Sequence, residues 1–270
     1  MNASAFSEPF TPRGVASFAR AKFSHLFLAQ CIFAFIAALV VAWFFYVCCF
    51  PVVQKAVENL PSDGQIQSGK LAWGGPPFQT LAEGHFLAFD VDLYHSGQFR
   101  STAADLQIEF GLGSVQVFSL FGYFEMSYPP NGFMQFNRPQ LQPLWEAWRS
   151  IILFAIAAAT FISLLLIWWI LATLHFLLIW LTGFFTNRDL DVRMSWKLSG
   201  AALLPGAMLM ILGIFLYGCG ILNLISFLFV FGAHFVLGWL YLLFALPFFT
   251  RIPSATPKGN PFKPNGKSKS

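Results

Sequence analysis

The sequence predicts a membrane α-helical protein: four transmembrane helices, with one β-rich extracytoplasmic domain inserted between the first and the second. Two observations predict this class. Of 270 residues, 57% are hydrophobic and only 10% are charged, whereas ordinary soluble domains carry about 25% charged residues. The apolar residues also gather in long runs, separated by segments of aqueous composition. Such clustering indicates that lipid solvates part of the chain.

The first transmembrane helix is predicted at residues 26–53. It follows a basic segment, residues 1–25, and Gln30 is its only strongly polar residue. The run is longer than the roughly 7 to 15 apolar residues of a cleavable signal peptide, and no small-residue cleavage site follows it. We therefore expect an uncleaved signal anchor with a cytoplasmic N-terminal segment.

Residues 54–150 have the composition of a folded aqueous domain, with most of the acidic residues of the chain. Alternation of apolar and polar residues predicts strands here. Gly111 to Ser114 separates two of them and so predicts a hairpin. The predicted strands lie within residues 85–94, 106–110, 115–118 and 121–128.

Residues 151–185 form an apolar run that is too long for one span and short for two, since a helix crosses a bilayer with about 20 residues. We favour one crossing from about residue 151 to 174, followed by a tilted or interfacial extension. Trp145 and Trp148 precede the run, which suits the membrane interface. The alternative is a tight pair of spans.

The remaining chain predicts a cytoplasmic loop at residues 186–197, then two spans within 198–249 and a disordered cytoplasmic tail at 250–270. The two spans are expected to join near residues 217–220. The tail is rich in Pro, Lys and Ser, a composition that cannot build an apolar core.

Charge predicts the orientation. With one crossing in the long run, eleven basic residues fall on the proposed inside and five on the outside, together with nine acidic residues. The positive-inside rule then places both termini in the cytoplasm of a multi-pass plasma (inner) membrane protein. The basic residues assigned to the outside are Lys55, Lys70, Arg100, Arg138 and Arg149.

His175 and His234 lie within apolar runs. A titratable group at membrane depth suggests a proton relay, a metal ligand or a gating contact. The simpler interpretation is an interfacial position for His175 and, for His234, a hydrogen bond to a nearby backbone carbonyl. Two histidines are too few for a metal site.

Asp90 and Asp92 resemble the D-x-D pattern that holds a divalent metal in some glycosyltransferases. Alternation places both carboxylates on one face of a strand, and we expect that face to be solvated. Asp189 and Asp191 receive the same interpretation. The sequence contains no pattern typical of metalloproteases, nucleophile elbows or phosphate loops, so neither an enzyme nor a cofactor is predicted.

The four cysteines do not form a metal-binding pattern. Cys48, Cys49 and Cys219 are expected near the outer face, where two of them could form a disulfide. The simpler interpretation is burial as small apolar side chains. Cys31 lies deeper in the first apolar run.

Pro205 lies in the third predicted span with Gly200, Gly206 and Gly213 around it. This pattern indicates a kink or a close contact between helices. The spans contain no Asp, Glu, Lys or Arg, which weighs against an ion-coupled transporter.

The layout resembles domain-of-unknown-function family 1189, bacterial membrane proteins of which some are described as maltodextrin-utilisation proteins. The similar stretches are Asn59 to Pro61, Ser68 to Leu71, Phe89 to Asp92 and Trp196 to Pro205. The resemblance covers nearly the whole chain and implies four spans. It implies no activity, because the family has no established catalytic residues.

These observations favour a non-enzymatic sensing, binding or scaffold protein that acts through its extracytoplasmic domain. Its expected partners are the lipid bilayer and another membrane or envelope protein, with an unknown ligand. A transport accessory protein or small permease is the alternative. Nucleic acid is not expected, because the net charge of +4 is small and spread along the chain. An outer-face enzyme would require His85, His95 and the two strand aspartates to converge.

Overall fold

The computed structural model describes residues 10–95 and 104–251. The described residues divide into two compact units. The first lies within residues 1–33, 164–210 and 231–270, and the second within 34–163 and 211–230.

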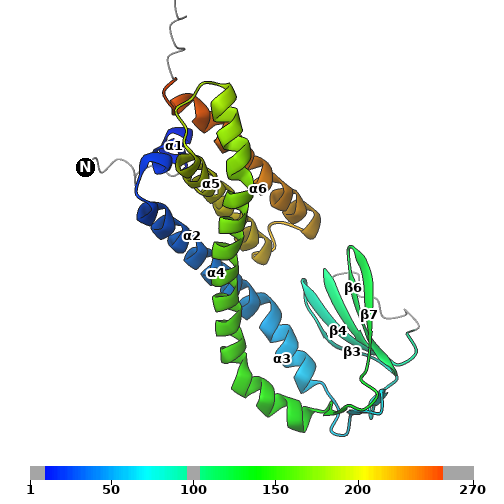
Figure 1. Ribbon diagram of the computed structural model, residues 1–270. Coiled ribbons are helices and arrows are strands. Elements are labelled where there is room, and N and C mark those ends of the chain that lie inside the picture. Colours follow the sequence, from blue (N-terminus) through cyan, green and yellow to red (C-terminus); the bar gives the residue numbers. More distant parts are fainter. Residues whose placement is uncertain (1–9, 96–103, 252–270) are drawn as a thin grey trace, which may run out of the picture. The chain divides into compact units, whose positions relative to one another are not determined.

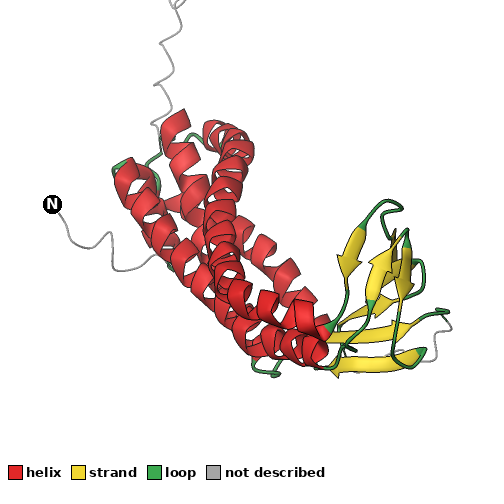
Figure 2. Ribbon diagram, turned by 90° about the horizontal axis from the view of Figure 1, so that it is seen from below, coloured by secondary structure: helices red, strands yellow, loops and turns green. Residues whose placement is uncertain are grey.

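Four helical stretches among the described residues are long and apolar enough to cross a membrane. Within the described residues, the β-strands all lie between the first and the second of these stretches (Figure 1), so the predicted order of elements is confirmed. Figure 2 distinguishes the helices, in red, from the strands, in yellow. The stretches are α2 (Phe23–Phe44) with η2 (Phe45–Cys49) and α3 (Phe50–Glu58); α4 (Arg138–Phe185); α5 (Val192–Gly218); and α6 (Leu224–Ala245) with η3 (Leu246–Phe248).

Helix α4 is continuous over 48 residues. At 1.5 Å per residue it is about 72 Å long, more than twice the roughly 30 Å of a bilayer's hydrocarbon core. It contains the whole of the long apolar run, including the stretch for which we expected an interfacial extension. A tight pair of spans would need a turn within residues 151–185, and α4 has none.

The first unit includes a short helix, α1 (Pro12–Arg20), before the first long one. Thr11 caps it, because the Thr11 hydroxyl accepts a hydrogen bond from the Gly14 amide at 3.0 Å. Its apolar side is buried, and Phe18 is only 3% exposed. Phe18 therefore packs within the protein.

The glycines of α5 allow close helix contacts, as the sequence predicted. A Cβ atom at Gly206 would lie 2.6 Å from the backbone carbonyl oxygen of His234 in α6. In the second unit, a Cβ atom at Gly213 would lie 2.7 Å from Val230. Helix α5 continues through Pro205 without a break.

The second unit contains two sheets, and Figure 1 shows strands β3, β4, β6 and β7 side by side. The larger sheet has the order β3-β4-β5-β6-β7, antiparallel except for the parallel pair β4 and β5. The smaller is antiparallel with the order β2-β1-β8. The strands are β1 (Gln65–Gln67), β2 (Lys70–Ala72), β3 (Phe78–Glu83), β4 (Leu87–Asp92), β5 (Leu106–Phe110), β6 (Ser114–Ser119), β7 (Gly122–Ser127) and β8 (Phe133–Gln135).

Strands β5 and β6 form the predicted hairpin, and β7 lies within the predicted strand 121–128. We call residues 59–137, between α3 and α4, the β region. Its core combines side chains of both sheets with Ala56 of α3, and Leu141 of α4 packs against it. The β region is thus anchored to the two helices that flank it in sequence.

Candidate functional site

Five polar residues form a row across one face of the larger sheet. Thr80 pairs with Asp90, Asp90 with Glu109, Glu109 with Gln116, and Gln116 with Glu125. Residues directly opposite one another on neighbouring strands share a face. The row therefore places three carboxyl groups on the same side of the sheet.

Asp90 and Asp92 do share one face of β4, as predicted, but the expectation that this face is solvated is wrong. Asp90 is 1% exposed and Asp92 is 0% exposed. Strand β4 lies inside the sheet between β3 and β5, so neighbouring side chains cover it. The Gln107 side-chain amide donates to Asp90 at 2.9 Å, and the Tyr94 backbone amide donates to Asp92 at 3.1 Å.

Burial raises the pKa of Asp90, and hydrogen bonds from Thr80 and Gln107 oppose the rise. When folding raises the pKa of a carboxyl group, that group favours the folded state. Its full contribution to stability is present only at pH values below its pKa in the unfolded chain. This stabilisation is lost as the pH rises through the folded pKa. Ionised Asp90 therefore costs stability near neutral pH.

We expect Asp90→Asn to stabilise the protein more at pH about 7.5 than at pH about 4.5, since asparagine has no carboxyl to ionise. The amide oxygen can still accept from Gln107. Thermal unfolding of the full-length protein in detergent, compared with wild type at both pH values, measures the difference. Equal shifts in midpoint at the two pH values would show that ionised Asp90 is not destabilising.

A chain of hydrogen bonds joins four side chains on the same sheet face. His95 Nδ1 lies 2.6 Å from Glu109 Oε1, and His95 Nε2 lies 3.0 Å from Ser114 Oγ. The Ser114 hydroxyl donates to Glu125 Oε1 at 2.8 Å. The chain thereby connects the residues following β4 with β5, β6 and β7.

The hydrogen bonds of this chain can form only if one of its groups carries an additional proton. If both carboxylates at the ends are ionised, each bond is satisfied only when His95 donates from both ring nitrogens and is charged. A neutral ring accepting from Ser114 leaves no hydroxyl proton for Glu125, which must then carry a proton itself. In the other neutral tautomer, His95 donates from Nε2 to Ser114 and accepts at Nδ1, so Glu109 must carry the proton. The four groups together therefore hold one proton that His95, Glu109 or Glu125 can carry.

Gly111 makes room for the imidazole ring. A Cβ atom at Gly111 would lie 2.0 Å from His95 Nε2, which is impossible without displacing the ring. Glu109 is 1% exposed, and its second oxygen, Oε2, is buried without a hydrogen-bond partner in the part of the chain described here. His95 is thus the partner that compensates the Glu109 carboxylate.

The order of serine, histidine and glutamate resembles a hydrolase triad, in which a base takes the proton of an exposed nucleophile. Ser114 differs because it is 5% exposed and its hydroxyl contacts Glu125 as well as His95. His85 lies apart and exposed, with its ring against Phe86. Among the described residues, no group of three His, Cys, Asp or Glu side chains could hold a metal ion.

Strand β7 forms an apolar edge on the larger sheet. It pairs with β6 on one side and, within the described residues, with no strand on the other. All six of its residues are exposed, with Phe124 at 66% and Met126 at 60%. Phe121, in the turn before β7, is 82% exposed. Natural edge strands usually carry charge or Pro that blocks pairing, and here Glu125 is the only charged residue.

The intramembrane histidines take different environments in the first unit. His175 of α4 packs against Trp239 of α6 with ring centroids 4.7 Å apart. Its Nδ1 atom is buried without a hydrogen-bond partner among residues 10–95 and 104–251. His234 Nδ1 bonds the Phe231 carbonyl, so the predicted backbone hydrogen bond is confirmed. No hydrogen bond or ring contact of the described chain joins the two histidines.

The cysteines are free in this structure. Cys48 donates from Sγ to the Gly218 carbonyl at 3.4 Å, beside Cys219 in sequence. Cys48 and Cys49 are half-buried and Cys219 is exposed. The outer-face disulfide thus stays a prediction, and the structure places Cys48 close to the chain segment that carries Cys219.

Asp189 and Asp191 are exposed, as predicted. Asp191 has a structural role, because its carboxylate accepts a hydrogen bond from the Met194 amide at 2.5 Å. An Asp in this position caps the start of a helix, here α5.

Glu109, Ser114 and Glu125 were not singled out from the sequence. Their signal was polar residues at alternate positions of the strands that became β5, β6 and β7. The parallel pairing of β4 with β5, which brings Asp90 opposite Glu109, had no sequence signal.

No protein-family model, no curated protein and no solved structure matches the chain. The resemblance to family 1189 therefore stays a prediction.

Proposed function

We propose that the chain is a four-span plasma membrane protein with both termini in the cytoplasm and the β region outside. Contacts in the first unit support a position of its basic segments on the same side of the membrane. Arg20 donates to the Phe248 carbonyl at 3.2 Å, Arg188 donates to the Phe249 carbonyl at 2.7 Å, and Lys197 donates to the Ala21 carbonyl at 2.7 Å.

These three contacts link the N-terminal segment, the loop between α4 and α5, and the end of the last apolar helix. An even number of spans returns the chain to the side on which it began, and four spans fit this gathering. The linked segments carry most of the basic residues of the chain, and an excess of Lys and Arg is typical of the cytoplasmic side.

In the second unit, the end of α5 contacts the β region. Tyr217 donates a hydrogen bond to Asp105, and its ring packs against Phe86 with centroids 4.7 Å apart. The end of α5 and the β region therefore share a side of the membrane, which supports an outside position for both.

We further propose that the β region binds an extended segment of another envelope protein, which adds to β7 as a sixth strand. The observation that carries this proposal is the open edge of β7 together with its exposed apolar side chains, Phe124 and Met126. Strand addition satisfies the free backbone N–H and C=O groups of an edge while alternate side chains give specificity. Insertion of β7 into lipid would leave those backbone groups unsatisfied.

Photo-crosslinking tests this binding mode. A photoreactive amino acid in place of Phe124 in the full-length protein, expressed in its own cells, should form an adduct with one contiguous segment of a partner. A synthetic peptide of that segment should bind the purified protein. Replacing its central residue by proline should abolish binding, because proline lacks the N–H that a strand donates.

Lysine substitutions provide the quantitative prediction. Phe124→Lys together with Met126→Lys should weaken peptide binding at least about tenfold, since loss of an interface hot spot costs about 2 kcal/mol or more. Tyr94→Lys is the matched control, because Tyr94 is also a highly exposed aromatic residue of the β region. Fluorescence titration measures both affinities. Adducts with lipid alone, or equal binding of the proline peptide, would exclude strand addition.

A further inference from the structure

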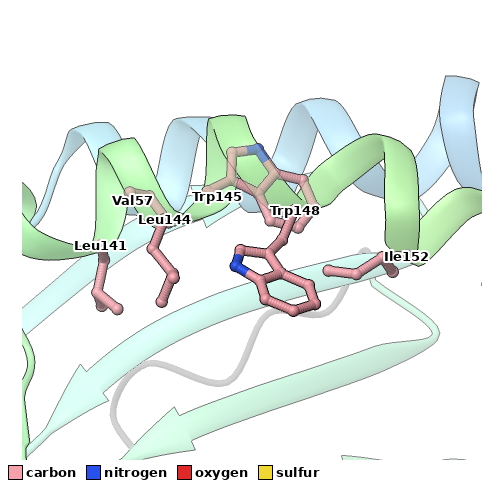
Figure 3. A pocket seen from close by; sticks show the side chains of 6 residues that line it. All are labelled: Val57, Leu141, Leu144, Trp145, Trp148 and Ile152. Carbon is pink, nitrogen blue, oxygen red and sulfur yellow. The ribbon is translucent and has the colours of Figure 1, made fainter.

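An apolar groove lies along α3 and α4 in the second unit, and no residue of β7 lines it. Its volume is about 320 Å³. Figure 3 shows Leu141, Leu144, Trp148 and Ile152 projecting from one side of α4. The groove is lined by Val57 of α3 and by Leu141, Leu144, Trp145, Trp148 and Ile152 of α4.

One end of the groove lies outside the uncharged stretch of α4, where the helix still carries charged residues. Glu146 and Arg149 are the last charged residues of the helix, and Leu144 and Trp148 lie before or between them. Leu144 is 53% exposed and Trp148 is 51% exposed. Contiguous apolar surface in water is unfavourable and usually marks a binding site, so this end of the groove requires cover.

The other end of the groove is continuous with the membrane-spanning part of the same helix. Positions 144, 148, 152, 155 and 159 fall on one face of α4, and all five are exposed. On the membrane side of Ile152, this face of α4 carries the small side chains of Ala155 and Ala159, which project little from the helix. A long, thin apolar molecule can therefore lie along α4 from the bilayer into the groove and contact apolar side chains over its whole length.

We propose that this groove binds one acyl chain of an outer-leaflet membrane lipid. The proposal rests on the proposed membrane position of α4, and it is independent of strand addition at β7. Burial of CH₂ groups is favourable, so a chain lying on Leu144 and Trp148 removes apolar surface of both molecules from water. Trp at this boundary is typical of a lipid interface.

The test uses full-length protein in nanodiscs that contain a phosphatidylcholine with a photoreactive group at the end of one acyl chain. Adducts should map to residues 141–152 as well as to the membrane-spanning part of α4. Leu144→Glu with Trp148→Glu should lower the yield in 141–152 at least about fivefold. Adducts in residues 155–185 serve as the internal reference for folding and insertion.

Two further variants separate the groove from general lipid contact. Ser150→Glu adds a charge to an exposed position between Trp148 and Ile152 on another face of α4, and it should leave the yield in 141–152 unchanged. Ala155→Trp places a large side chain on the face of α4 that carries Leu144 and Trp148, without adding charge, and it should lower that yield. Adducts confined to residues beyond Ile152, or equal yields in all variants, would overturn the proposal.

Discussion

A His95→Phe variant is expected to lose about 3 kcal/mol of stability in the β region. The substitution removes the imidazole that bonds Glu109 at 2.6 Å. Glu109 is 1% exposed, so its carboxyl group is left buried without a hydrogen-bond partner, and such a buried, unsatisfied polar group costs about 1 to 3 kcal/mol, and more if it is charged. Denaturant unfolding of the full-length protein, followed by tryptophan fluorescence, measures the loss.

His85→Phe is the control for this substitution, because His85 is an exposed histidine of the same region and should tolerate the change within about 0.5 kcal/mol. Adding Glu109→Gln to His95→Phe removes the stranded charge and should recover part of the stability. If His95→Phe is as stable as His85→Phe, the histidine does not compensate a buried carboxylate.

Gly206→Ala is expected to disrupt the packing of α5 on α6. The added Cβ would meet a backbone carbonyl oxygen, that of His234, at 2.6 Å, and backbone cannot rotate aside as a side chain can. Overpacking of this kind typically costs about 1 to 3 kcal/mol. The thermal unfolding midpoint of the detergent-solubilised protein should therefore fall.

Gly232→Ala is the matched control, since it adds the same methyl group within α6 with no atom within 4 Å. Alanine favours a helix over glycine by about 1 kcal/mol, so the control should be unchanged or slightly more stable. A similar midpoint for both variants would show that α5 and α6 do not pack closely at Gly206.

The order of the four long helices could be predicted from the sequence, because lipid solvation requires long apolar runs that composition alone reveals. The sequence did not show whether residues 151–185 form one helix or two, since an apolar run does not indicate where the bilayer ends. In the structure, a single continuous helix, α4, contains all of residues 151–185.

The hairpin of β5 and β6 was predictable because both strands and their turn are adjacent in sequence. The polar face of the sheet was not. Alternation assigns residues to faces, but it does not say what covers a face, and Asp90 was therefore expected in solvent. Its burial depends on the parallel pairing of β4 with β5, whose strands are separated by residues 93–105.

The side of the membrane on which the β region lies is the claim on which both binding proposals depend. Labelling with a membrane-impermeant thiol reagent tests it directly, in a full-length protein whose native cysteines are replaced by serine. Lys70→Cys, in β2, should be labelled in intact cells, whereas Arg193→Cys, near the start of α5, should be labelled only after permeabilisation. Labelling of Arg193→Cys in intact cells, with Lys70→Cys protected, would contradict the proposed topology.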